Sequence, residues 1–304
     1  MEPARSDHGK SPAATTRLAS ATAALHDCAL CGNACHLDRT ATSGPCGIRA
    51  TPYVASYGPH HGEERVLSGW RGSGTIFFSG CNLHCVYCQN YDISQEHAGI
   101  AVDPEPLATI MMSLQDHGCH NINLVSPTHV ASAIVPALLL AHHAGLTIPI
   151  VYNTGGYDAP QALALMDGLV DIYMPDMKYS NDLTAYALSG IRNYPAVNRA
   201  AVTEMHRQVG DLIVNDQGLA QRGLLVRHLV LPGGLAGTDG VARFLATEIS
   251  PDTYVNIMAQ YRPAYRARAC ATEALPIDRR PTQGELAAAT STARAAGLHR
   301  FDNE

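Results

Sequence analysis

The fold of this chain is decided by one stretch, Gly80-Cys81-Asn82-Leu83-His84-Cys85-Val86-Tyr87-Cys88-Gln89-Asn90. Its cysteines follow the spacing C-x3-C-x2-C. The run Thr75-Ile76-Phe77-Phe78-Ser79 directly before it predicts a short buried strand, because β-branched and aromatic residues dominate the run. The cysteines therefore lie on a loop at the end of a strand, which is where α/β folds carry their chemistry. Thiolates this close together favour a soft metal or an iron–sulfur cluster.

A disulfide pair or a structural zinc site is the alternative interpretation of this loop. Tetrahedral zinc needs a fourth protein ligand, and His84 lies awkwardly between Cys81 and Cys85. A [4Fe–4S] cluster held by three cysteines instead leaves one iron open for a small molecule.

The loop, with Tyr87 directly before Cys88, resembles the signature of the radical S-adenosylmethionine (SAM) superfamily. The resemblance implies a [4Fe–4S] cluster on Cys81, Cys85 and Cys88, and Tyr87 as a cofactor-binding residue. It also implies that the amine and carboxylate of SAM chelate the open iron. An electron from the cluster would then cleave SAM to methionine and a 5′-deoxyadenosyl radical.

The composition is that of a globular protein, with 304 residues, 46% apolar and 16% charged residues and a formal net charge of −6. This length suits one large α/β domain with a small accessory module. No Lys/Arg run suggests a nucleic-acid or membrane surface, and no apolar run approaches the roughly 18 residues of a membrane span. Residues 1–24 lack the apolar centre of a secretory signal, so we expect a flexible tail and a cytoplasmic protein.

A second group of cysteines precedes the loop, at the spacing C-x2-C-x3-C-x10-C with Gly or Pro beside several of them. Tight groups of this kind, in a chain without a signal, are typical of metal sites and not of disulfides. Four thiolates would complete a tetrahedral zinc site or hold an auxiliary iron–sulfur cluster, and the spacing favours neither. The proposed ligands are Cys28, Cys31, Cys35 and Cys46.

From Thr75 onward, predicted strands and helices alternate, which is the pattern of a parallel sheet. Six βα units match the partial (β/α)6 TIM-type barrel that the resemblance implies. We therefore expect a tail over 1–24, a Cys-rich metal-binding module with its linker over 25–74, and the radical SAM barrel over 75–304. We also expect the module to have a core of its own. The predicted strands are 75–79, 121–125, 148–152, 170–174, 224–231 and 254–258.

Ser126-Pro127-Thr128-His129 follows the second predicted strand, at the active face of such a barrel. In radical SAM enzymes this position often carries a Gly-Gly-Glu motif that binds the amino group of SAM. Here Ser126 and Thr128 could contact SAM through hydroxyls and backbone, and His129 is a candidate hydrogen-bonding group or proton donor. The alternative is a loop that only caps the next helix.

The third and fourth strands end in Asn153-Thr154-Gly155 and Asp176-Met177-Lys178. These runs resemble the Asp-Thr-Asn-Gly and Asp-Leu-Lys motifs of pyruvate formate-lyase activating enzymes, which bind a monovalent cation and the carboxylate and ribose region of SAM. Asn153 stands where that family has Asp, which removes a charge from the cation site. Lys178 can reach the SAM carboxylate or pair with Asp176, so a structural ion pair is the alternative.

The fifth and sixth strands also carry polar residues. Strand alternation places Arg227 and His228 on opposite faces. A charged residue in so apolar a strand needs a partner, and SAM, its cluster, a substrate carboxylate or a core Asp would serve. Gln260 and Tyr261 follow the last strand and are expected near the substrate.

The resemblance extends to the pyruvate formate-lyase activating enzyme-like branch and runs from Cys28 to about Phe301. It implies an oxidoreductase that abstracts hydrogen, and an electron donor such as flavodoxin or ferredoxin. The substrate would be a glycine of a glycyl-radical protein or, alternatively, a small molecule or peptide. A metal-binding protein without catalysis is disfavoured, because the cluster loop and the strand-end polar residues occur together.

Overall fold

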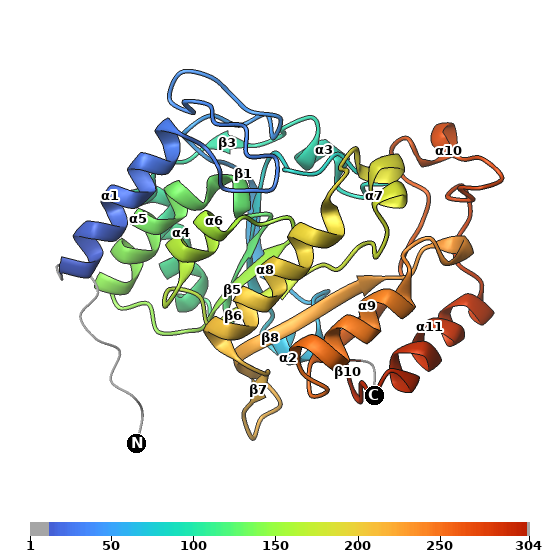
Figure 1. Ribbon diagram of the computed structural model, residues 1–304. Coiled ribbons are helices and arrows are strands. Elements are labelled where there is room, and N and C mark those ends of the chain that lie inside the picture. Colours follow the sequence, from blue (N-terminus) through green and yellow to red (C-terminus); the bar gives the residue numbers. More distant parts are fainter. Residues whose placement is uncertain (1–11, 303–304) are drawn as a thin grey trace.

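A computed structural model describes residues 12–302 (Figure 1). Its centre is an open sheet in the order β10-β9-β8-β6-β5-β4-β2-β1-β3. All neighbouring pairs from β10 to β2 are parallel. The strands of the parallel core are β2 (Ser73–Phe78), β4 (Ile122–Val125), β5 (Ile150–Thr154), β6 (Ile172–Pro175), β8 (Ala220–Leu229) and β9 (Tyr254–Met258). The predicted partial (β/α)6 fold is confirmed, and β9 begins and ends where the sequence predicts.

The edges of the sheet carry the remaining strands. β1 (Tyr53–His60) pairs antiparallel with β2, β3 (Ile100–Ala101) pairs with β1, and β10 (Arg300–Phe301) extends the sheet beyond β9. β8 begins four residues earlier than predicted, because β7 (Ile213–Val214) folds back and pairs with its first residues.

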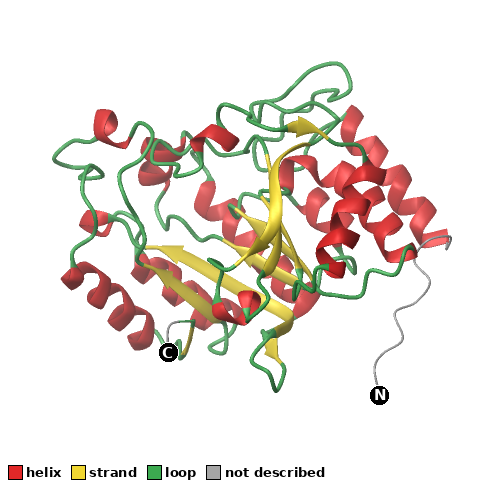
Figure 2. Ribbon diagram, turned by 180° about the vertical axis from the view of Figure 1, so that it is seen from behind, coloured by secondary structure: helices red, strands yellow, loops and turns green. Residues whose placement is uncertain are grey.

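Helices connect the strands and lie along one side of the sheet in Figure 1, while Figure 2 shows the strands from behind. The longer ones after β3 are α4 (Pro104–Asp116), α5 (Ala131–His143), α6 (Pro160–Met166), α7 (Asp182–Ser189), α8 (Tyr194–Val209), α9 (Thr238–Phe244) and α11 (Gln283–Ala295). Shorter segments are α2 (Arg65–Ser68), α3 (Tyr91–Ser94), α10 (Ala267–Cys270), and the 3-10 and π turns at 128–130, 232–234 and 245–249. Among the described residues, no helix has the length and apolar character needed to cross a bilayer.

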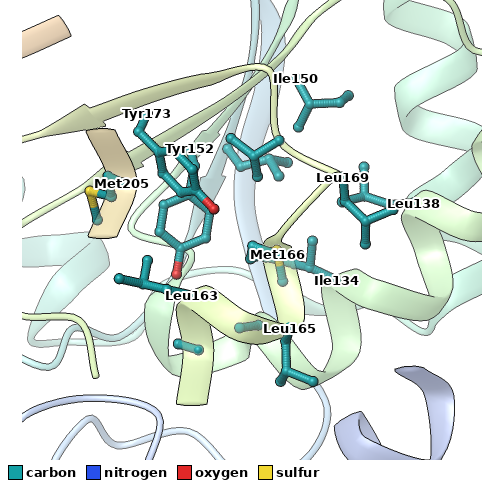
Figure 3. Close-up of a cluster of buried hydrophobic side chains, with 14 of the residues drawn as sticks. Ile134, Leu138, Ile150, Tyr152, Leu163, Leu165, Met166, Leu169, Tyr173 and Met205 are labelled. Atoms are coloured by element: carbon teal, nitrogen blue, oxygen red, sulfur yellow. The ribbon is translucent and has the colours of Figure 1, made fainter. Parts of the chain in front are cut away.

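The main core lies between these helices and the sheet (Figure 3). Tyr152 and Tyr173 pack edge to face, with ring centroids 5.6 Å apart. Their hydroxyls donate to Asp158 and Gln208, so each buried ring keeps a hydrogen-bonded end. Each aliphatic side chain buried around them contributes roughly 1.5–3 kcal/mol. The residues labelled around the two tyrosines are Ile134, Leu138, Ile150, Leu163, Leu165, Met166, Leu169 and Met205.

Helix α1 (Pro12–His26) corrects the expectation of a flexible tail over residues 1–24. Alanine is the strongest helix former, but its small side chain leaves little amphipathic pattern to detect. Ala21 and Ala24 are buried, and Arg17 donates to the carbonyl of Leu165 over 2.6 Å. The part of the predicted tail at 1–11 lies outside the described residues.

The Cys-rich module shares its core with the barrel, so the expectation that each part has its own core is wrong. Cys28, Leu30 and Ile48 belong to the same buried cluster as Ile76 and Phe78 of β2. The module therefore packs directly against β2, the strand that leads into the cysteine loop.

The linker between the module and the barrel closes one end of the barrel interior. Leu67 of α2 is fully buried against Val151, Ile172 and Leu225 on the inner faces of β5, β6 and β8. This contact carries the preceding acidic pair, Glu63 and Glu64, into the barrel.

Candidate active site

The cysteine loop follows the end of β2, as predicted. Cys81, Cys85 and Cys88 lie between β2 and α3, and all are free thiols, so the disulfide alternative is not realised. Within residues 12–302, no three Cys, His, Asp or Glu side chains converge as the ligands of one metal ion. The loop supplies three thiols, one fewer than the four ligands that tetrahedral zinc needs.

Each sulfur of the loop has a hydrogen-bond partner. Cys85 contacts the Ser189 hydroxyl at 3.0 Å and Cys88 contacts the Ser94 hydroxyl at 3.1 Å. The Leu83 amide donates to Cys81 Sγ over 3.4 Å. Such donors stabilise sulfur that carries negative charge.

Burial dominates the acid–base behaviour of these thiols. It raises the pKa of Cys81 to about 12 and also raises the pKa of Cys85, while the nearby Lys178 ammonium acts in the opposite direction on both. A thiolate here needs compensating positive charge. The iron of a [4Fe–4S] cluster supplies such charge, so the donor set fits this group.

The strand-end residues assemble into one charged network. Asp176 Oδ1 accepts from Arg227 Nε over 2.9 Å, and the Lys178 ammonium donates to Oδ2 of the same carboxylate. Arg227 Nη2 donates to Asn153 Oδ1 over 2.8 Å. Burial acts to raise the pKa of Asp176, but Arg227 and Lys178 outweigh it, so the pKa is lowered and the carboxylate stays charged.

The two interpretations of Asp176 and Lys178 are compatible in this geometry. The ion pair exists, and the Lys178 ammonium also lies close enough to Cys85 to influence its pKa. Its side chain is 17% exposed. The Lys178 ammonium, held between the Asp176 carboxylate and the thiols, can contact a ligand bound there.

Sequence reasoning missed Glu63 as a member of this network. Its Oε2 lies 3.9 Å from Arg227 Nη1, and its Oε1 lies 3.3 Å from His60 Nδ1. Next to it, the Asn256 amide donates to Glu64 over 2.8 Å. The only sequence signal was an acidic pair in a Gly- and His-rich linker, which has no periodicity to place it.

Thr128 and Thr154 converge on an acid that the sequence also did not reveal. Their hydroxyls donate to the two oxygens of Asp158 over 2.6 and 2.7 Å, and Tyr152 donates to it over 3.2 Å. Asp158 is 1% exposed, and its burial raises its pKa. Both threonine hydroxyls are thus used within the fold.

His129 holds the start of the cysteine loop. The buried ring donates from Nε2 to the Ser79 carbonyl over 2.8 Å. Burial lowers the pKa of His129 to about 4, so the imidazole is neutral at pH 7. The ring is a positioning group for the loop and not an exposed proton donor. Ser126, by contrast, is half-buried with φ 58°, and its amide donates to the Asn153 carbonyl over 2.8 Å.

A series of hydroxyls links Tyr87 to the cysteines. The Tyr87 and Tyr179 hydroxyls are hydrogen-bonded, Tyr179 contacts Ser189 at 2.7 Å, and Ser189 contacts Cys85. Nearby, the Tyr194 hydroxyl donates to the carbonyls of Gly155 and Asp176 and accepts from the Lys178 amide. These tyrosines fix the β5 and β6 ends against the cysteine loop.

The segment after β9 covers the cysteine loop, and α3, α7 and α10 lie at the same end of the molecule (Figure 1). The Arg266 amide donates to the Val86 carbonyl over 2.9 Å. Tyr265 stacks on Tyr91 with centroids 5.1 Å apart, and Tyr261 packs edge to face on Tyr87 at 5.7 Å. Gln260 and Tyr261 therefore lie beside the loop, and their place near a substrate stays a prediction.

The cysteines of the N-terminal module also lie together. Cys35 Sγ and Cys46 Sγ are 3.2 and 4.0 Å from the position that a Cβ on Gly44 would occupy. Cys28 lies close enough to Cys31 and Cys35 for its charge to act on both thiols, after burial, in raising their pKa. All four are free thiols. Within residues 12–302, no three of them converge as the ligands of a single metal ion.

Comparison with known proteins gives three findings. The family model described as the radical SAM superfamily matches residues 75–214. The chain is similar to an uncharacterized protein of Methanocaldococcus jannaschii, with 32% identity over 282 residues that cover 90% of this chain and 75% of that protein. It is also similar to Streptococcus suis SuiB, solved with the precursor peptide SuiA, at a TM-score of 0.45 and 10% identity. That match covers 73% of this chain and 46% of SuiB, so the chain spans about half of the SuiB length.

Proposed function

The chain belongs to the radical SAM superfamily, and we propose that it cleaves SAM reductively at a [4Fe–4S] cluster on Cys81, Cys85 and Cys88. When bound there, a [4Fe–4S] cluster would supply the electron that cleaves SAM to methionine and a 5′-deoxyadenosyl radical, and this radical would abstract hydrogen from the substrate. The observation that carries this proposal is the charged network of Asp176 and Lys178 beside the thiols.

In this proposal Lys178 receives the carboxylate of SAM. Asp176 orients the ammonium and keeps it protonated, because the carboxylate raises the pKa of Lys178 against the effect of burial. Ser126, Thr128 and Thr154 lie at the ends of β4 and β5 as candidate SAM contacts, and Tyr87 lies on the loop itself. Buried charge-assisted contacts of this kind are worth roughly 1.5–3 kcal/mol each.

Arg227 takes the place of a bound cation in the proposed site. In the activating enzymes the matching motifs bind a monovalent cation, whereas here the guanidinium contacts both Asp176 and Asn153. A fixed positive charge at this position would repel a metal cation. The presence of Asn at 153 in place of Asp is consistent with this, since it removes one carboxylate from the group that Arg227 and Lys178 neutralise.

Two substrate classes remain in the proposal. A glycine on a glycyl-radical protein is the first, which rests on the resemblance to activating enzymes. A small molecule or peptide is the second, and the cover formed by Tyr261, Tyr265 and Arg266 favours it. In both cases the electron would come from a donor such as flavodoxin or ferredoxin. We also propose a second metal on Cys28, Cys31, Cys35 and Cys46.

Anaerobic reconstitution tests the central proposal. The reduced protein with SAM should yield methionine and 5′-deoxyadenosine, and Cys85→Ala should abolish both products. Cys270→Ala is the matched control, because this cysteine lies outside both groups and should retain activity. SAM cleavage by the Cys85→Ala protein would disprove the cluster assignment. A glycyl-radical EPR signal on an added partner protein would identify the first substrate class.

A further inference from the structure

Arg39 is a buried cation that has no carboxylate partner within residues 12–302. It is 1% exposed, and its guanidinium donates to the carbonyls of Arg49 and His129 over 3.0 and 3.4 Å. Its remaining contact is from Nη1 to Cys28 Sγ, over 3.4 Å, and Nε has no hydrogen-bond partner within the described residues. A buried guanidinium is strongly destabilising unless an anion balances it.

Within the described residues, the ionisable side chain that hydrogen-bonds to Arg39 is Cys28, which makes the cysteines beside it the source of a balancing anion. A thiol is neutral, whereas a thiolate bound to a metal carries charge. Four thiolates on Zn²⁺, or on a [4Fe–4S]²⁺ core, give a centre with a net charge of about −2. Because no three of these thiols already converge as ligands of one ion within residues 12–302, binding a single ion would require rotation of their side chains.

The module that contains these cysteines contacts both neighbours of Cys81. A Cβ on Gly80 would lie 2.6 Å from the Cys46 carbonyl oxygen and 3.1 Å from His129 Nε2, so the glycine is needed there. On the other side, the Asn33 amide donates to the Asn82 carbonyl over 3.0 Å. Cys81 is therefore held between two contacts of the N-terminal module.

Arg39 joins these two regions. Its guanidinium contacts Cys28 and the backbone carbonyl of His129, and the His129 ring in turn holds the Ser79 carbonyl. The path from the first cysteine group to the strand end before Cys81 thus contains two buried side chains.

We propose that Cys28, Cys31, Cys35 and Cys46 bind a metal centre as thiolates, that Arg39 is its buried counter-charge, and that the loaded module positions Cys81. Each thiol releases its proton to solvent when it binds the metal. The metal site stands independently of SAM chemistry. Its coupling to Cys81 rests on the proposed function.

The first test compares metal content in the full-length protein purified without oxygen. Zinc and iron are measured by mass spectrometry in wild type, Arg39→Gln, Arg39→Lys and Arg49→Gln, and alkylation by iodoacetamide reports on Cys28 and Cys35. Arg49 is the control, because it is an exposed arginine of the same module. Within the described residues, its side chain donates hydrogen bonds to the carbonyls of Thr40 and Ala41 over 2.7 Å.

Arg39→Gln should lose at least half of the module's metal and expose Cys28 and Cys35 to alkylation, whereas Arg39→Lys should restore most of both. Arg49→Gln should match wild type. Extra zinc identifies a zinc centre, and iron beyond four atoms per chain identifies a cluster. Full metal in Arg39→Gln, equal loss in the Gln and Lys variants with wild-type circular dichroism, or reactive module thiols in wild type would each overturn the assignment.

The second test addresses the coupling. Cys46→Ser should lose the module's metal, retain iron at Cys81, Cys85 and Cys88, and alter the EPR spectrum of the reduced cluster there. Its midpoint potential should become less negative, because Arg39 keeps its charge after the anionic centre is lost. An unchanged spectrum and potential, with the module's metal gone, would disprove the coupling. Absence of SAM cleavage in wild type would instead count against the proposed function.

Discussion

Arg227 donates from Nε to Asp176 Oδ1 over 2.9 Å and so connects the middle of β8 with the end of β6. This arginine occupies the inner face of β8, while His228, the next residue, points to the outer side and donates to Thr238 or accepts from it at 2.9 Å. The strand alternation predicted from sequence is therefore realised. Asp176 contacts Arg227 directly, so a core Asp is one partner of this arginine. A contact of Arg227 with SAM or substrate stays a prediction.

Replacing this arginine should create a dependence on monovalent cations. Arg227→Met removes the positive charge that neutralises Asp176 but keeps a long apolar side chain. SAM affinity should fall about 10- to 100-fold, the equivalent of roughly 1.5–3 kcal/mol, and added K⁺ or Na⁺ should restore part of it. Isothermal titration at several salt compositions measures this, with N-methylglucamine as the ion control. An Arg227→Met protein that binds SAM equally well in all salts would contradict the assigned role.

Asp176→Ala should weaken SAM binding more than it destabilises the fold. The carboxylate orients Lys178, and its loss should reduce affinity by roughly 1.5–3 kcal/mol for a charge-assisted contact. Binding is measured by titration and stability by thermal melting. Wild-type affinity together with a lowered melting temperature would return Asp176 and Lys178 to a purely structural ion pair.

His129 gives a prediction about pH. Its folded pKa, about 4, lies below its ordinary value of 6.5 because burial disfavours the charged ring. The buried neutral ring therefore makes its full contribution to the free energy of unfolding above pH 6.5. This contribution is lost as the pH falls toward 4, by up to about 3 kcal/mol. His129→Gln should flatten this part of the stability curve, measured by urea unfolding between pH 4 and 7. An identical slope in wild type and variant would show that another group titrates.

The sequence predicted those features that depend on local pattern. The parallel strands alternate with helices at a regular spacing, and the cysteine loop has a distinctive order of residues, so both were found where expected. Features that depend on distant contacts were missed. Arg39 looks like any surface arginine until its burial under His129 is known, and Asp158 gains its role only when two threonines from other elements reach it. Helix α1 was missed because alanine hides an amphipathic pattern.

The cover over the cysteine loop should behave differently for the two substrate classes. Tyr265 stacks on Tyr91 and has φ 50°, a left-handed conformation that glycine adopts more easily. Tyr265→Gly should thus remove the aromatic contact without straining the backbone, and Tyr265→Phe should keep the contact.

If a small molecule or peptide is the substrate, the cover should protect the radical from solvent and unwanted reaction. Loosening it in Tyr265→Gly should then increase 5′-deoxyadenosine formed without substrate by several-fold, while Tyr265→Phe should behave as wild type. If a protein loop is the substrate, the cover must open for each encounter, and Tyr265→Gly should instead leave the uncoupled rate unchanged and accelerate radical transfer to the partner. Chromatographic measurement of 5′-deoxyadenosine, with and without the partner, distinguishes the two results. Equal rates for all three proteins in both assays would show that this segment does not control access to the site.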